Sequence, residues 1–180
     1  MRELAVSDPD VEIVWRAYEL RPEPVPTLPP GGDYLQRAWA NSVRPLAAGL
    51  GVTMKLPPVQ PRSRLAHQAA HWARTQGRFD EYHAAIFRAF FERGEDIGHV
   101  DVLGALAWGL GLSGEFLGEA LERRECEPGV LDDEQAAQTL GLSGVPAFVA
   151  DRRAAATGVQ PVETLKQLVE HVRSSKAPER

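Results

Sequence analysis

Strand-like sequence is confined to two places in this 180-residue chain, and a long helix-like stretch separates them. Residues 11–15 are rich in β-branched and aromatic side chains and predict a mostly buried strand. Residues 145–150 predict a short apolar strand, residues 151–153 a turn, and residues 154–157 a second strand. Because neither end has enough strands for a stable sheet by itself, the pattern predicts one α/β domain with a helical insertion.

The sequence between these strands carries apolar residues at helical spacing. After a proline-rich loop at residues 22–30, Asp33 is expected to cap a helix that runs to about Leu50, with a kink or a break at Pro45. A last amphipathic helix is expected to begin at Pro161, its first helical position. Further helices are predicted over residues 63–75, 79–93, 99–109, 114–124 and 130–140, with Gly77, Gly94 and Gly141 at helix ends.

The charge balance bears on the class of partner. The chain has 20 Lys and Arg against 25 Asp and Glu, a formal net charge of −5 and a pI near 5.6. Nucleic acids and anionic membranes recruit a basic surface, so we expect neither as a partner. The first residues lack the apolar stretch of a signal peptide, and the longest near-apolar run, residues 102–112, is too short to cross a bilayer. We therefore expect a soluble, cytoplasmic protein, and without a Gly-rich phosphate loop we expect no cofactor.

The chain contains one cysteine, Cys126. One cysteine permits no internal disulfide, no Cys-x-x-Cys redox pair and no thiolate zinc site. The acidic neighbours Glu125 and Glu127 disfavour a thiolate, so we interpret Cys126 as a bystander rather than a nucleophile. An intermolecular or mixed disulfide at this thiol is the alternative.

Two further groups of residues have a chemical and a structural interpretation. His67 and His71 lie four residues apart on one predicted helix, a spacing that can chelate a metal, but Gln68 stands where a zincin motif has its catalytic Glu. We favour packing for both histidines and predict no metal site. We also predict that five aromatic residues on helices belong to the core: Trp39, Trp72, Phe87, Phe90 and Trp108.

Gly144-Val145-Pro146 begins the first strand of the predicted C-terminal hairpin. Proline cannot donate to a strand ladder, so Pro146 belongs at a sheet edge or opposite something that replaces a neighbouring strand. One interpretation is an ordinary trans proline that starts an edge strand. The other is a cis proline that turns the backbone of Val145 outward, where it can pair with an extended ligand.

Four blocks of sequence occur in an order that spans nearly the whole chain. They are Val-Trp-Arg-Ala-Tyr-Glu-Leu-Arg-Pro at 14–22, Arg-Leu-Ala-His at 64–67, Phe-Phe-Glu-Arg-Gly-Glu-Asp-Ile at 90–97, and Gly-Val-Pro-Ala-Phe at 144–148, followed by a hairpin, Gly-Val-Gln-Pro at 158–161 and a helix. As a set they resemble DsbA-family thioredoxin-like proteins, above all FrnE-like dithiol oxidoreductases, 2-hydroxychromene-2-carboxylate isomerases and kappa-class glutathione transferases. Ala17 and Tyr18 stand where the family usually has Pro and Phe.

The resemblance implies a single DsbA-like domain over residues 1–180 with an α/β thioredoxin-like fold. It assigns residues 1–30 and 141–175 to the thioredoxin-like part and residues 31–140 to the helical insertion. It also places a first strand and a Cys-x-x-Cys motif before the strand at residues 11–15, so the fold is expected to be N-terminally incomplete. We therefore expect no catalytic residue in this chain, and a substrate-binding role for Val145 and Pro146.

The function implied by the resemblance is thiol–disulfide exchange with a protein or small-molecule substrate. Two explanations account for the missing redox motif: a true start codon about 30 residues upstream, or a degenerate protein without redox activity. The alternatives are a glutathione-dependent isomerase or transferase of the hydroxychromene-carboxylate type, and a non-catalytic peptide- or ligand-binding relic. An isolated chain with unpaired strand edges is expected to dimerise, to exchange strands, or to be poorly stable.

Overall fold

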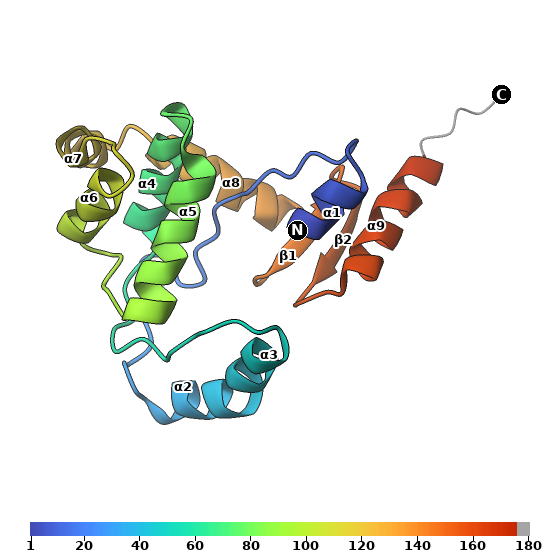
Figure 1. The fold of residues 1–180 in the computed structure, drawn as a ribbon, viewed down its shortest axis with the longest axis horizontal. Helices are drawn as coiled ribbons and strands as arrows, with labels where there is room; N and C mark the ends of the chain where they lie inside the picture. Colours follow the sequence, from blue (N-terminus) through green and yellow to red (C-terminus); the bar gives the residue numbers. More distant parts are fainter. Residues whose placement is uncertain (176–180) are drawn as a thin grey trace. The chain divides into compact units, whose positions relative to one another are not determined.

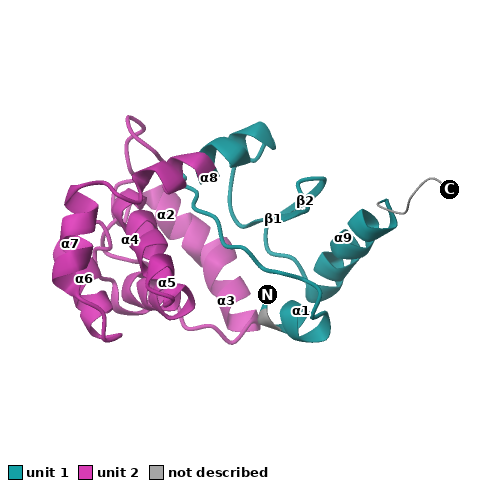
Figure 2. Ribbon diagram, turned by 90° about the horizontal axis from the view of Figure 1, so that it is seen from above, with its two compact units in different colours: residues 1–20, 133–180 teal, residues 21–132 magenta. Residues whose placement is uncertain are grey.

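The hairpin and the helices divide between two units of the chain. The computed structural model describes residues 1–175, with the backbone alone for Arg2. Unit 1 combines Met1–Leu20 with the chain from Asp133 onward, and unit 2 is Arg21–Asp132 (Figure 2). The assignment of residues 1–30 and 141–175 to one part of a single domain, and of 31–140 to an insertion, stays a prediction.

Unit 1 contains the only strands among residues 1–175. Strands β1 (Ala147–Ala150) and β2 (Ala154–Thr157) pair antiparallel, with Phe148 opposite Ala156 and Val149 opposite Ala155. Helix α9 (Val162–Ser174) packs against both strands, and the short helix α1 (Arg2–Ser7) packs against α9 (Figure 1). The predicted hairpin is therefore present, and its second strand has the predicted bounds.

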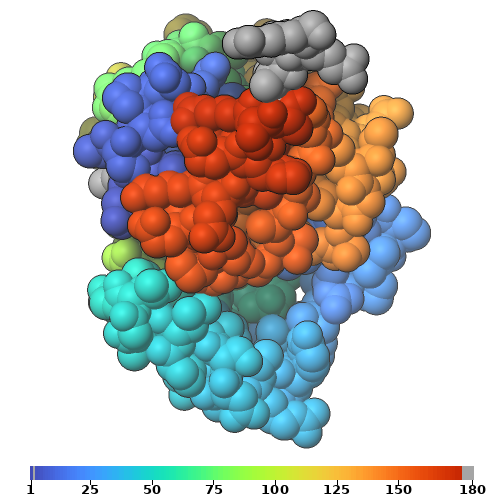
Figure 3. Space-filling view, turned by 90° about the vertical axis from the view of Figure 1, so that its right-hand side faces the viewer, coloured from blue at the N-terminus to red at the C-terminus, as the bar shows by residue number. Residues whose placement is uncertain are grey.

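The interior of unit 1 is small. Its buried apolar side chains include Leu4 from α1 and Leu165 and Val172 from α9. A polar tie joins the same two helices, because the Arg173 guanidinium donates to both carboxylate oxygens of Asp8 at 2.7 and 3.0 Å. Figure 3 shows α1, α9 and the hairpin side by side at the surface of this unit.

The predicted strand at residues 11–15 is wrong. These residues are extended but belong to no strand, and Val14 and Trp15 are 51% and 39% exposed. A strand requires a hydrogen-bonded neighbour, and within the described residues β1 pairs with β2 alone. The segment is held by a side chain instead: Asp133, on α8, accepts from the backbone N–H of Ala17 and from Arg16 Nη1, both at 2.9 Å.

Unit 2 is helical. Helices α4 (Arg64–Thr75), α5 (Phe79–Arg88), α6 (Val100–Trp108) and α7 (Gly114–Glu122) pack on one another (Figure 1). A π-helical turn, η2 (Ala89–Arg93), continues α5, and Gly94 ends it with φ 72°. Helix α8 (Glu127–Thr139) starts in unit 2 and ends in unit 1. All five helices predicted between residues 63 and 140 are thus present, although α8 begins three residues earlier than predicted because Pro128 is tolerated in a first helical turn.

The helix predicted from residue 33 to about residue 50 is present without a break. Helix α2 (Asp33–Ala38), the π-helical turn η1 (Trp39–Val43) and α3 (Arg44–Gly49) follow one another directly. Pro45 lies just after η1 and has no N–H to donate, and the wider η1 turn before it accommodates the proline within the helix. The N-cap is Gly32 rather than Asp33, which instead places its carboxylate in the positive first turn.

The core of unit 2 lies among α4, α5, α6 and α7. Tyr82, Leu103 and Leu117 are fully buried, and Tyr82 Oη donates to the Leu103 carbonyl at 2.8 Å. Helices α6 and α7 approach closely where two glycines face each other, because a Cβ on Gly114 would lie 2.9 Å from the Gly104 carbonyl oxygen. Among the described residues, no helix has both the length and the apolarity required to cross a membrane.

Candidate functional site

The loop of Val145 and Pro146 connects α8 to the hairpin of unit 1. Helix α8 ends at Thr139, and the φ of 70° at Gly141 just after it lets the N–H of Leu142 reach back to the Ala137 carbonyl at 3.0 Å. The chain then leaves the helix and enters β1 at Ala147. Both the glycine at the helix end and the strand that follows were predicted from sequence.

Val145 is exposed to solvent at the start of this strand. The residue is 50% exposed, and among the described residues of unit 1 its backbone N–H and C=O have no hydrogen-bond partner. The Val145–Pro146 peptide bond is cis. On the other side of the loop, Gly158 N–H donates to the Pro146 carbonyl at 2.8 Å, which extends the β1–β2 ladder by one position. The binding of an extended ligand by Val145 and Pro146 stays a prediction.

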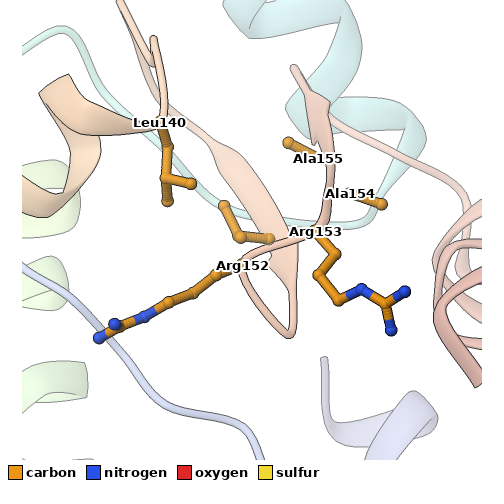
Figure 4. Close-up of a pocket in the computed structure, with 6 residues that line it drawn as sticks. Leu140, Arg152, Arg153, Ala154 and Ala155 are labelled. Atoms are coloured by element: carbon orange, nitrogen blue, oxygen red, sulfur yellow. The ribbon is translucent and has the colours of Figure 1, made fainter. Parts of the chain in front are cut away.

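A hollow of about 120 Å³ lies beside the turn of the hairpin, and Val145 and Pro146 are not part of its lining. It is lined by Leu140, Val149, Arg152, Arg153, Ala154 and Ala155. The two arginines diverge (Figure 4), and Arg153 donates to the Val172 and Ser175 carbonyls of α9 at 3.5 and 3.2 Å. The guanidinium of Arg153 therefore binds carbonyl groups at the C-terminal end of α9. The residues that line the hollow do not direct a set of polar groups toward one point.

Cys126 lies in the turn between α7 and α8 of unit 2. It is half-buried and packs against the apolar core. Burial and, secondarily, the nearby Glu125 carboxylate raise the pKa of its thiol. The thiol is therefore held in its protonated, unreactive form, in line with the interpretation as a bystander.

His67 and His71 both lie on α4, as the sequence indicated. The His71 ring packs over Gly129 of α8 so closely that a Cβ at this glycine would lie 2.9 Å from His71 Nδ1. Within residues 1–175, no three His, Cys, Asp or Glu side chains come close enough together to hold a metal ion. The packing interpretation therefore accounts for His71 directly.

The core interpretation of the aromatic residues holds for Trp39 and Trp72, which are 6% and 8% exposed, but is wrong for Phe87 and Trp108, which are 51% and 79% exposed. Phe87 belongs to a row of rings on one face of α5 and η2, because residues four apart share a helix face. Ring centroids along this row are 5.1, 4.9 and 5.8 Å apart, in the order Phe79, His83, Phe87 and Phe91. The row gives the half-exposed Phe87 ring aromatic neighbours on its own helix in place of a core.

Sequence reasoning did not find Asp133, although it is 4% exposed and fixes the segment that carries Arg16 and Ala17. Its partners lie 116 and 117 positions away in the chain, so no local pattern reveals the contact. The one available signal is that this carboxylate occupies the same face of α8 as Val130, three residues earlier, which is fully buried.

Comparison with known proteins places the chain in a family. Residues 1–170 match the DsbA-like thioredoxin domain. The uncharacterised protein YwbO of Bacillus subtilis (strain 168) is 39% identical over 125 residues, which are 68% of this chain and 62% of YwbO. The matched part therefore spans less than two thirds of the length of this relative.

Two solved structures resemble the chain in fold. A probable DsbA oxidoreductase of Streptomyces coelicolor superposes with a TM-score of 0.78 at 24% identity, covering 99% of this chain and 84% of that one. A candidate protein disulfide isomerase of Nitrosomonas europaea superposes with a TM-score of 0.65 at 21% identity, covering 82% of this chain and 78% of that one. The predicted α/β thioredoxin-like fold is thereby confirmed. The chain belongs to the DsbA-like thioredoxin domain family.

Proposed function

We propose that this chain provides the substrate-binding part of a thiol–disulfide oxidoreductase, with Val145 and Pro146 as the site for an extended peptide. The observation that carries the proposal is the half-exposed Val145 just before β1, whose backbone has no hydrogen-bond partner among the described residues of unit 1. An extended peptide can add to such a segment through main-chain hydrogen bonds, as in other cases of strand addition. Membership of the DsbA-like family supports thiol–disulfide exchange as the chemistry that the bound peptide undergoes.

The proposal assigns peptide binding, and no electron transfer, to these 180 residues. Dithiol chemistry needs one thiolate that attacks the substrate disulfide and a second that resolves the mixed disulfide. The chain has a single thiol, and burial together with Glu125 raises its pKa. Cys126 therefore lacks both the partner and the thiolate character that the reaction requires.

Peptide binding can be measured by fluorescence anisotropy. The probe is a fluorescein-labelled extended peptide of Val, Thr and Ser residues around one S-methylthiolated cysteine. Val145→Asp should weaken binding about tenfold, or about 1.4 kcal/mol. Val14→Asp is the matched control, because Val14 lies in the same unit and is 51% exposed against 50% for Val145. Equal losses in the two variants, or no loss in Val145→Asp, would contradict the proposed site.

The absence of electron transfer has its own test. The 180-residue chain should not accelerate the reduction of insulin by dithiothreitol above the rate of the reductant alone. Acceleration would overturn the assignment, because it would require redox chemistry from a single, protonated thiol. The expectation of an upstream start codon is tested separately by translating the DNA before Met1. That idea fails if no in-frame strand pattern followed by Cys-x-x-Cys is encoded there.

A further inference from the structure

One continuous helix of unit 2 lies outside the four-helix core. Helix α2, the turn η1 and helix α3 together span residues 33–49, and Figure 1 shows α2 and α3 beyond the end of α5 that continues into η2. Among the described residues, the apolar core cluster begins at Leu65 and contains no member of this 33–49 helix. The helix has a small set of buried side chains of its own, namely Leu35, Trp39 and Ala47.

The loops on both sides of the 33–49 helix are fixed to other parts of unit 2. Before the helix, Arg62 Nη1 donates to the Arg21 and Val25 carbonyl oxygens, at 3.1 Å in each case. After the helix, the Lys55 N–H donates to the Phe91 carbonyl of η2 at 2.8 Å. The helix therefore connects two loops that are held in place by their own hydrogen bonds.

Between these loops, an aromatic contact joins the 33–49 helix to the core helices. The ring centroids of Trp39 and Phe91 lie 6.3 Å apart, with 38° between the ring planes. Phe91 is also the last ring of the aromatic row, 5.8 Å from Phe87, so Trp39 continues this row onto a second helix. Trp39 is 6% exposed, whereas Tyr34 on the same helix is 64% exposed. Because a buried indole contributes a large apolar area, Trp39 is the side chain that attaches the helix most strongly.

The 33–49 helix has glycines with left-handed backbone beside both ends and little stability of its own. Gly31 and Gly51 have φ of 68° and 64°, a conformation that glycine adopts at little cost. Isolated short helices are marginal in water, and Pro45 in addition removes one N–H from this helix. If Trp39 leaves Phe91, the helix is therefore expected to unfold locally while the flanking loops stay fixed.

We propose that the 33–49 helix is a hinged segment that opens separately from the four-helix core, and that the contact of Trp39 with Phe91 holds it closed. Opening removes the Trp39 ring from Phe91 and so lengthens the exposed part of the aromatic row, in which Phe87 is already half-exposed. Segments with few buried apolar contacts supply local openings of this kind. The inference does not rest on the proposed peptide site, because it concerns unit 2 alone.

The first test is hydrogen exchange of the full chain at neutral pH, measured by mass spectrometry of peptic fragments. Trp39→Ala should speed the exchange of residues 36–49 by about tenfold or more and leave residues 66–75 of α4 unchanged. Tyr34→Ala is the matched control, because it removes an exposed ring from the same helix and should leave both segments unchanged. The proposal is overturned if Trp39→Ala speeds both segments equally, speeds neither, or has no larger effect than Tyr34→Ala.

The second test asks whether Phe91 is the partner through which Trp39 acts. Phe91→Ala should speed the exchange of residues 36–49 as much as Trp39→Ala does, and the double variant should add little, because both substitutions break the same contact. Phe87→Ala removes the neighbouring ring of the row and should have a much smaller effect on this segment. Additive effects of Trp39→Ala and Phe91→Ala, or no effect of Phe91→Ala, would show that this contact does not hold the helix closed.

Discussion

Each of the two units is stabilised internally by a different kind of interaction. Unit 2 encloses a continuous apolar core in which Tyr82, Leu103 and Leu117 are fully buried. Unit 1 buries few apolar side chains and depends on two polar ties between distant parts of the chain, Asp133 to residues 16 and 17 and Arg173 to Asp8. Apolar burial is non-directional and depends on the volume that fills the core, whereas a polar tie depends on individual donors and acceptors. The comparison predicts that unit 2 is sensitive to lost volume and unit 1 to lost hydrogen bonds.

The largest expected effect is in the core of unit 2. Leu103→Ala should lower the free energy of unfolding by about 2–5 kcal/mol, because it removes fully buried methyl groups and leaves a cavity. The change is measured by urea unfolding, with hydrogen exchange of residues 64–122 as the readout. Val100→Ala on the same helix is the control, because Val100 is 40% exposed and should cost much less. Equal losses would show that this core does not carry the stability of unit 2.

In unit 1 the corresponding test is a polar substitution that keeps the volume. Asp133→Asn should cost about 1–3 kcal/mol, because the Ala17 N–H and the Arg16 guanidinium donate to different oxygens and the substitution replaces one of these oxygens by an NH2 group, which cannot accept. Faster hydrogen exchange of residues 11–20 would report the loss. Asp132→Asn, at the exposed neighbouring position, should leave the exchange of that segment unchanged. Unaltered exchange in Asp133→Asn would refute the role given to this tie.

The same difference explains which parts of the fold could be predicted from the sequence. Helices α4 to α7 follow from apolar residues at spacings of three and four, a pattern within each helix that does not depend on other parts of the chain. The hairpin follows from an apolar run, a polar turn and a second run. Residues 11–15 have the composition of a strand, but their state depends on whether a neighbouring backbone is present, which composition does not record.

The candidate site likewise combines features that local sequence predicts with features that depend on distant contacts. The position of Pro146 at the start of a strand could be predicted, because proline has no N–H to donate to the hydrogen-bond ladder of a central strand. The hydrogen bond from Gly158 to the Pro146 carbonyl could not, because it requires the register of β1 with β2. The exposure of Phe87 was also missed, because a helical aromatic at core spacing has the same sequence pattern whether it meets another helix or the next ring of an aromatic row.

The tie between α1 and α9 makes unit 1 sensitive to acid. A hydrogen bond from Arg173 is the main cause that lowers the pKa of the Asp8 carboxyl below its ordinary value of 3.8. Stability from this tie is therefore present above about pH 4 and is lost as the pH falls through the lowered pKa of the folded state. The midpoint of thermal unfolding should differ between wild type and Arg173→Gln near neutral pH, and the difference should vanish in strong acid. A difference that persists there would show that Arg173 acts through packing rather than through the ion pair.

The smallest expected effect is a loss of stability on acidification that begins at a higher pH in unit 2 than in unit 1. Burial between Phe79 and Phe87, and secondarily the charge of Arg74, lower the pKa of His83 below 6.5, while Asp80 opposes the shift. The unfolded state then binds a proton at a higher pH than the folded state, so unit 2 should lose stability as the pH falls below about 6.5. Unit 1 loses the stability of its ion pair only below about pH 4.

Urea unfolding between about pH 7.5 and pH 5 should therefore show a loss of stability in wild type that is reduced in His83→Gln. If His83→Gln retains the full slope, the acid sensitivity of unit 2 does not arise in the aromatic row.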